Sequence, residues 1–148
     1  MADLRASGST LLAERIATLS PAKRRLLRES MEPRPSSGSD MLAGQHAALG
    51  ISHVYTITGV PIDRALACCA ARGIRLIGVR DQRSAALMAL AQNYQAGRLA
   101  AAVMVSAGPA VTNVATAIHT AQANCWPLLV IGGCAASDLR GMGEFEEL

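Results

Sequence analysis

The sequence predicts an α/β domain in which a parallel β-sheet carries helices on both faces. Apolar residues make up 51% of the chain but aromatic residues only 3%, so the core must be built from Ala, Leu, Ile and Val. Such a core favours helices packed on a sheet over a β-sandwich. From residue 40 onward, short apolar runs alternate with helical patterns, and the runs are apolar throughout rather than at every second position. This is typical of parallel strands that are buried on both faces.

The first 39 residues differ from the rest and predict a basic helical arm followed by a flexible linker. Apolar residues recur there at helical spacing in two runs, and the second run begins with Ser20 as N-cap and Pro21 at the first helical position. Residues 32–39, EPRPSSGS, have the composition of a linker. We therefore expect residues 1–39 to be the arm and linker, and residues 40–148 to be the globular domain.

Helices and strands alternate regularly within the globular domain. The first helix is expected at residues 40–50, capped by Asp40 and ended by Gly50. A strand of β-forming residues, HVYTIT, follows, and Gly73 closes the helix after it. The expected strands are residues 53–58, 74–79, 100–106 and 127–133. The later helices are expected at residues 63–73, 83–97 and 112–124. Right-handed crossovers are the default for such a chain.

A ligand site is expected at the carboxyl ends of these strands, as in other parallel α/β sheets. Four loops meet there: TGVPI at 58–62, VRDQ at 79–82, SAGPAVTN at 106–113 and GGCAAS at 132–137. Three of them contain glycine, which lets the backbone approach a ligand closely, but ordinary tight turns need the same residues. The loop at 106–113 lacks the lysine of a Walker loop, and no GxGxxG follows the first strand. The loops alone leave a ligand site and simple turns as equal alternatives.

Charge and hydropathy argue against nucleic-acid or membrane partners. The formal net charge is +3, and the basic residues collect in the first third without interleaved aromatic side chains, so we interpret them as a solvated face. The apolar runs are far shorter than the roughly 20 residues that cross a bilayer. No secretory signal opens the sequence, and we expect a cytoplasmic protein.

The cysteines and histidines form no catalytic or metal-binding pattern. No pair of cysteines has zinc-ligand spacing, so we interpret the four as buried small hydrophobes rather than ligands. The histidines lie in different predicted elements without a matching nucleophile or carboxylate, and we interpret them as surface or packing residues. These residues are Cys68, Cys69, Cys125, Cys134, His46, His53 and His119. We expect no metal site in this chain.

Five motifs follow one another along the domain, from about Met41 to Leu148. In chain order they are GISHVYTITGVPI, GIRLIGVRDQRSAALMA, VMVSAGPAVTN, NCWPLLVIGG and GMGEFEEL. Taken together they resemble the N-terminal pyrimidine-binding domain of thiamine diphosphate (ThDP) dependent enzymes. GVPI in place of the commoner GVPG, NCWPLLVIGG and the glycine-phenylalanine-glutamate pattern look closest to the 2-hydroxyacyl-CoA lyase and oxalyl-CoA decarboxylase branch. The sequence stops within that last pattern, before the helix and strand that finish the family's domain, so we expect a domain truncated at its C-terminus.

The resemblance implies a ThDP site that is shared with a partner. In that family the aminopyrimidine ring lies against this domain, while a separate diphosphate-binding domain or subunit holds the diphosphate and its Mg²⁺. This chain lacks the glycine-aspartate-glycine motif and the downstream asparagine of that second domain, so the partner would hold the metal and the chain would not be active alone. The residues that would contact the cofactor are Gly59, Val60, Pro61, Ile62, Gln82, Pro109 and Asn113.

Gln82 stands where the family carries its catalytic glutamate. That glutamate exchanges a proton with the ring nitrogen N1′ and so helps to activate the cofactor. A glutamine amide can donate or accept a hydrogen bond but has no proton to exchange near neutral pH. If the exchange is ordinary general acid–base catalysis, its loss costs about 10² to 10⁴ in rate, or roughly 3 to 5 kcal/mol of barrier. A few members of the superfamily work without the glutamate, so catalysis at Gln82 stays open.

Two functions from different classes follow from these residues. The chain is either the pyrimidine-binding half of a ThDP-dependent carbon–carbon lyase or decarboxylase, as a split subunit or a fragment, or a non-catalytic docking module that has lost its carboxylate. The first function points to 2-hydroxyacyl-CoA or 2-oxo acid substrates. A third, weaker alternative is an unrelated flavodoxin-like nucleotide binder. In both leading cases we expect homo- or hetero-oligomers, because apolar helix surface and an uncovered sheet edge favour association.

Overall fold

The structure is a computed structural model that describes residues 19–21, 23, 37–143 and 147. The chain divides into two compact units, Met1–Pro35 and Ser36–Leu148. All helices and strands named below belong to the second unit.

The described part of the first unit is the start of its second predicted helix. The Ser20 Oγ accepts a hydrogen bond from the backbone N–H of Lys23 at 3.4 Å, and Pro21 has helical conformation. This is the geometry of an N-cap followed by proline at the first helical position. The rest of the predicted arm and residues 32–36 of the predicted linker lie outside the described residues.

A four-stranded parallel sheet forms the centre of the second unit, with strand order β2-β1-β3-β4. The strands are β1 (His53–Thr56), β2 (Arg75–Gly78), β3 (Ala101–Val105) and β4 (Val130–Gly132). The helices are α3 (Gly38–Ala48), α4 (Asp63–Ala71), α5 (Gln82–Ala96), α6 (Pro109–Thr112) and α7 (Ala115–Asn124). Every connection between successive strands contains at least one helix, as parallel pairing requires. The predicted fold class is confirmed.

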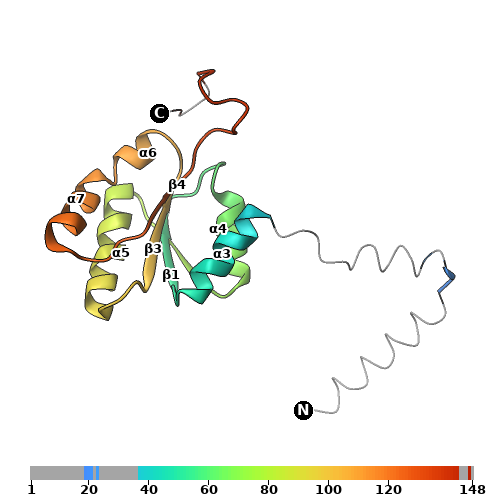
Figure 1. Cartoon of the computed structure of the whole chain (residues 1–148), viewed down its shortest axis with the longest axis horizontal. Coiled ribbons are helices and arrows are strands. Elements are labelled where there is room, and N and C mark those ends of the chain that lie inside the picture. The colour runs from blue at the N-terminus through green and yellow to red at the C-terminus, as the bar shows by residue number, and fades with distance from the viewer. Residues whose placement is uncertain (1–18, 22, 24–36, 144–146, 148) are drawn as a thin grey trace, which may run out of the picture. The chain divides into compact units, whose positions relative to one another are not determined.

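Helices cover both faces of the sheet, α3 and α4 on one face and α5, α6 and α7 on the other (Figure 1). Side chains alternate between the faces along each strand. Val54 and Met104 therefore pack under α3 and α4, whereas Tyr55 and Val103 pack under the helices of the opposite face. All five residues of β3 are buried. The continuous apolar run in the sequence reflects this central strand, which has a core on each side.

The buried side chain of Asn93 ties three elements together. It is 0% exposed. Its Oδ1 accepts hydrogen bonds from the backbone N–H groups of Ala100 and Ala101, at 2.8 and 2.7 Å. Its Nδ2 donates to the carbonyl oxygens of Ala101 and Pro127, at 3.0 and 3.1 Å. The C-terminal half of α5 is thereby fastened to the start of β3 and to the segment that leads into β4.

The predicted cap of the first helix is wrong by three residues. Helix α3 begins at Gly38, and its N-cap is Ser37, whose Oγ accepts from the backbone N–H of Asp40 at 3.3 Å. Asp40 lies in the first turn instead, where the positive end of the helix dipole favours a carboxylate. Its side chain also forms an ion pair with Arg72 of the loop after α4, at 3.4 Å.

Two other predicted elements differ by three residues at their start, more than the rest. The helix predicted at residues 112–124 begins at Ala115 as α7. The short helix α6 precedes it in the predicted loop, and Asn113 and Val114 lie between the two helices. The strand predicted at residues 127–133 pairs with β3 only from Val130 to Gly132. No helix among the described residues is long and apolar enough to cross a membrane.

The interpretation of the cysteines as buried hydrophobes is right for Cys69 alone. Cys69 is fully buried and Cys68 half-buried, while Cys125 and Cys134 are exposed, and all four are free thiols. Cys125 is the left-handed C-cap of α7, with φ 55°, and Cys134 follows β4. Both exposed thiols therefore lie just after the end of a helix or strand, at the surface of the domain.

Candidate functional site

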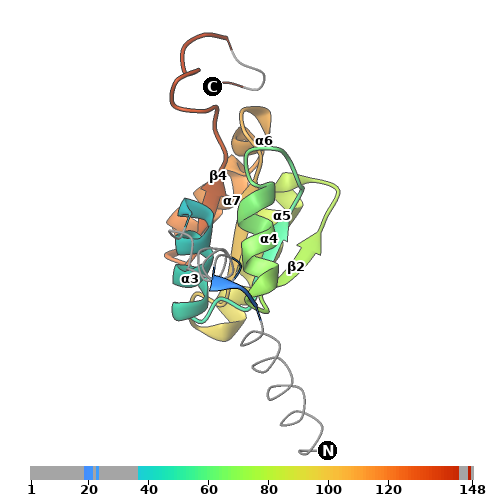
Figure 2. The ribbon, with the colours of Figure 1, turned by 90° about the vertical axis from the view of Figure 1, so that its right-hand side faces the viewer.

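A cavity of about 870 Å³ opens at the carboxyl ends of the strands. Its described lining comes from the loops after β1, β3 and β4, from α6, and from the first residue of α5. This is the end of the sheet at which α6 lies and toward which the β2 arrow points (Figure 2). The location agrees with the strand-end site that the sequence predicts.

Six of the predicted cofactor contacts line this cavity. They are Gly59, Val60, Pro61, Gln82, Pro109 and Asn113. The structure places the seventh, Ile62, elsewhere: it is 3% exposed and packs in the core under α3 and α4. Ile62 stabilises the loop after β1, because its backbone N–H donates a hydrogen bond to the carbonyl oxygen of Gly59 at 2.9 Å.

The loop after β1 is closed by reciprocal hydrogen bonds and by one close approach. The Gly59 carbonyl oxygen accepts from the Asp63 N–H at 3.1 Å, and the Gly59 N–H donates to the Asp63 Oδ1 at 3.0 Å. A Cβ at Gly59 would lie 2.6 Å from the Ser106 Oγ and 2.8 Å from its Cβ. Glycine is therefore what allows the loops after β1 and β3 to meet at the cavity.

An N-cap at Asp81 sets the position of Gln82. The Asp81 Oδ1 accepts from the backbone N–H of Ser84 at 2.8 Å and from its hydroxyl at 3.0 Å. Both hydrogen bonds lower the pKa of Asp81 below its usual 3.8, and the bond from the backbone N–H has the larger effect. Helix α5 thus starts at Gln82 rather than at the predicted Arg83, and Gln82 occupies its first turn.

The amides of Gln82 and Asn113 meet at the cavity wall. The Asn113 Nδ2 donates a hydrogen bond to the Gln82 Oε1 at 3.0 Å, across 31 residues of sequence. Asn113 is the C-cap of α6, and its backbone N–H donates to the carbonyl oxygen of Pro109 at 3.0 Å. The Gln82 oxygen is therefore engaged, and its Nε2 makes no hydrogen bond to the described residues. This contact was not foreseen from the sequence, because it joins two elements that are separated by β3.

Cys134 is a cavity residue that the sequence reasoning missed. It lines the cavity from the loop after β4, and its Sγ accepts a hydrogen bond from the Arg140 Nη2 at 3.0 Å. It is the one titratable side chain of the described lining. Its position in GGC, directly after the fourth strand, could have identified it from the sequence, because side chains at such positions are expected to face a ligand.

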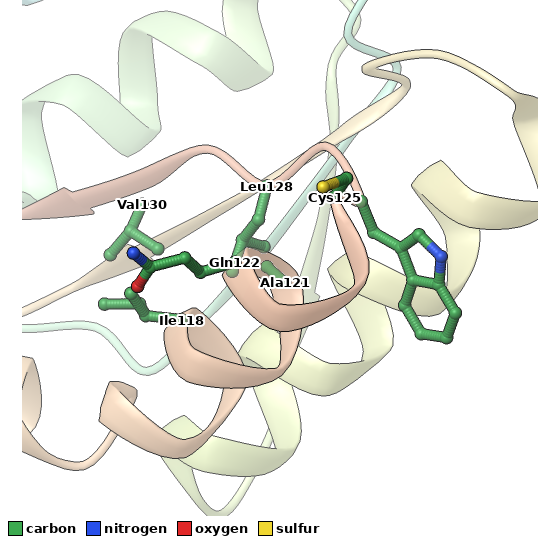
Figure 3. A pocket seen from close by; sticks show the side chains of 7 residues that line it. Ile118, Ala121, Gln122, Cys125, Leu128 and Val130 are labelled. Atoms are coloured by element: carbon green, nitrogen blue, oxygen red, sulfur yellow. The ribbon is translucent and has the colours of Figure 1, made fainter.

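A second cavity of about 450 Å³ lies between α7 and β4. Figure 3 shows Ile118 and Gln122 of α7 beside Val130 of β4. Its described lining holds no charged side chain and none of the predicted site residues. Of these two cavities, the strand-end cavity is therefore the one that the predicted site residues line.

Comparison with known proteins identifies the domain. Residues 36–148 match the family described as "Thiamine pyrophosphate enzyme, N-terminal TPP binding domain". The chain belongs to this family. The predicted membership of the ThDP-dependent enzymes is confirmed, and an unrelated flavodoxin-like protein is excluded.

Relatives of this ThDP-enzyme domain include the branch that the motifs suggest. The chain is 31% identical to mouse 2-hydroxyacyl-CoA lyase 1 over 111 residues, which cover 75% of the chain and 19% of the lyase. It is 33% identical to zebrafish 2-hydroxyacyl-CoA lyase 2 over 123 residues, covering 83% of the chain and 20% of the lyase. A probable acetolactate synthase of Mycobacterium bovis is 34% identical over 108 residues, which cover 73% of the chain and 20% of the synthase. The chain spans about a fifth of the length of the curated relatives it matches.

The cavity fits the pyrimidine end of ThDP. Apolar walls at Val60, Pro61 and Pro109 suit a flat aromatic ring, and the Gln82–Asn113 amide pair offers hydrogen bonds to ring nitrogens. The described residues contain no group of three His, Cys, Asp or Glu side chains that could hold a metal ion.

Proposed function

We propose that this chain binds the aminopyrimidine ring of ThDP and is the pyrimidine-binding half of a carbon–carbon lyase or decarboxylase. The observation that carries the proposal is the strand-end cavity, which gathers six of the predicted contacts from four separate segments. When bound, ThDP supplies the electron sink for breaking a carbon–carbon bond, and the protein supplies orientation and proton control.

The residues of the chain divide this work between them. Val60, Pro61 and Pro109 contact the ring and orient it, while Gln82 hydrogen-bonds a ring nitrogen. Gln82 holds that nitrogen without giving or taking a proton. The proton control of this half-site is therefore weaker than that of a carboxylate.

A partner completes the site in this proposal. The diphosphate and Mg²⁺ belong to a diphosphate-binding domain or subunit, so the chain alone has no lyase activity. Exposed apolar side chains such as Met88 and Ile118, which are 43% and 42% exposed, favour a homo- or hetero-oligomer.

Two of the three relatives named above are 2-hydroxyacyl-CoA lyases, and they support the choice of substrate class. We propose a 2-hydroxyacyl-CoA for the assembled enzyme. The probable acetolactate synthase supports a 2-oxo acid type substrate as the alternative.

A docking module without catalysis is the second candidate function. It is favoured by the described lining of the cavity, which holds no carboxylate, and by the engagement of the Gln82 oxygen by Asn113. In that case the fold and its apolar faces serve association alone.

Calorimetric titration of ThDP with Mg²⁺ tests the shared site. The chain is titrated alone and then mixed with a diphosphate-binding domain of a ThDP-dependent enzyme. We expect binding tighter than about 1 mM, or about −4 kcal/mol, only in the mixture. Binding of that strength by the chain alone contradicts the shared site, and its absence in both samples leaves the docking module.

Restoring the carboxylate separates the enzyme from the docking module. We expect Gln82→Glu, assayed with the partner, to raise ThDP-dependent turnover by about 10² to 10⁴, because the proton exchange with N1′ returns. Asn124→Ala, which removes an exposed amide of α7 that donates to the Thr120 carbonyl oxygen, is the matched control and should leave turnover unchanged. Unchanged turnover in Gln82→Glu argues for the docking module.

A further inference from the structure

The hydrogen bond to Asn113 gives the Gln82 side chain a defined polarity in this structure. An amide has one oxygen that accepts and one NH₂ group that donates. Asn113 donates to the oxygen at 3.0 Å, so the NH₂ group is what remains for a ligand. The hydrogen bond therefore decides which half of the amide a bound ring meets.

We propose that Asn113 is a positioning residue that orients the Gln82 amide, so that the cavity selects the neutral form of an aminopyrimidine ring. The inference rests on the proposed function, because it concerns the same ring in the same cavity. It goes further in assigning a role to Asn113 and a protonation state to the ligand.

Hydrogen-bond complementarity supports this selection. An unprotonated ring nitrogen accepts from the Gln82 NH₂ group. A protonated ring nitrogen would place one donor against another and leave both unpaired, which costs the desolvation of each. A carboxylate has the opposite preference, since it stabilises a cationic partner. The glutamine thus reverses the protonation state that this position favours.

The backbone positions of Gln82 and Asn113 are set by the ends of two helices. Gln82 follows the Asp81 cap of α5, and Asn113 closes α6 with its backbone N–H on the Pro109 carbonyl oxygen. Turning the Gln82 amide around would set its NH₂ group against the NH₂ group of Asn113. The pair therefore keeps its polarity as long as Asn113 donates.

Charged and titratable side chains around the cavity have partners other than Gln82. These are Asp63 with the Gly59 N–H, Asp81 with Ser84 and Arg83, Cys134 with Arg140, and Glu147 with the Gly141 and Gly143 N–H groups. Arg80 and Asp138, on the loops after β2 and β4, are exposed. The protonation preference of the cavity is therefore assigned to the amide pair.

The probe for this inference is 4-amino-2,5-dimethylpyrimidine, which carries the ring without thiazolium or diphosphate. Its ring pKa is measured free in solution by ultraviolet absorbance. Its dissociation constant for the full chain is then measured by saturation-transfer NMR at pH values on both sides of that pKa. If only the neutral ring binds, the apparent Kd rises about tenfold at one pH unit below the ring pKa.

Two variants and one control test the role of Asn113. Asn113→Ala frees the Gln82 amide to turn, so we expect the tenfold rise to shrink to less than about threefold. Gln82→Glu should bind the probe at least as tightly below the ring pKa as above it, because a carboxylate pairs with the protonated ring. Asn124→Ala should keep the profile of the unmodified chain. Far-ultraviolet circular dichroism confirms that each variant is folded.

The outcomes separate this inference from the proposed function. A tenfold rise in the unmodified chain that is lost in Asn113→Ala supports the positioning role. Saturable binding with the same pH profile in the unmodified chain and in Asn113→Ala overturns the inference and leaves the pyrimidine site standing. The absence of saturable binding in every chain at every pH overturns the inference, and the calorimetric titration with the partner then decides the proposed function.

Discussion

The Asn93 side chain satisfies backbone hydrogen-bonding groups in the interior of the domain, as a capping side chain does at a helix end. All four of its hydrogen bonds go to backbone groups, and its side chain is 0% exposed. When a buried backbone donor or acceptor loses its hydrogen-bond partner, the protein loses stability by the full desolvation free energy of that group. A polar residue on the inward face of a helix is here a structural requirement rather than a catalytic signal.

Asn93→Ala should lower the free energy of unfolding by about 3 kcal/mol or more, because it leaves several buried backbone groups unpaired. Urea denaturation followed by circular dichroism measures the change. The exposed amide variant Asn124→Ala is the control and should cost less than about 1 kcal/mol. Similar losses in the two variants would contradict the role given to Asn93.

Helix α5 depends on the charge state of its N-cap. The pKa of Asp81 is lowered chiefly by the Ser84 backbone N–H, then by the Ser84 hydroxyl. A carboxyl whose pKa is lower in the folded than in the unfolded chain contributes stability above the unfolded pKa. That contribution is lost as the pH falls through the folded pKa.

Asp81→Asn keeps an N-cap acceptor but has no proton to take up. We expect the unmodified chain to have the higher melting temperature at pH 7, and the difference to shrink as the pH falls below the usual carboxyl pKa of 3.8. Thermal unfolding from pH 7 to pH 2.5 measures this. A gap that stays constant over that range would show that the charge of Asp81 has no part in capping α5.

At the scale of the whole molecule, the second unit exposes apolar side chains, and the apolar strand β4 lies at an edge of its sheet. Met88 of α5 and Ile118 of α7 are 43% and 42% exposed, and these two helices pack on the same face of the sheet. Strand β4 pairs only with β3 in the described sheet, so its other edge is open. Such surfaces favour association with another chain.

We expect the chain to self-associate at micromolar concentrations, and Met88→Lys combined with Ile118→Lys to weaken that association at least about tenfold, or about 1.4 kcal/mol. Sedimentation velocity over a concentration series measures it. Met41→Lys places the same charge on an exposed residue of α3, at 62% exposure, and should have little effect. Equal weakening by Met41→Lys, or a chain that is monomeric throughout, would contradict this assignment of the surface.

Local pattern alone determined much of this protein. The alternation of apolar runs with helical segments predicted the parallel sheet, the helices on both faces and the edge of the sheet where the cavity opens. These features depend on residues close together in the chain, whose periodicity and turn chemistry report which face is buried. The family motifs likewise located Gln82, Pro109 and Asn113, which all line one cavity.

The tertiary structure decided what depends on contacts between distant segments. Ile62 packs in the core instead of lining the cavity, Cys134 is exposed at the cavity, and the amides of Gln82 and Asn113 meet across 31 residues. No local pattern encodes these contacts, because they depend on how α5 and α6 are set on the sheet. The sequence by itself determined which residue types stand at the strand ends, and packing decided which of their atoms face a ligand.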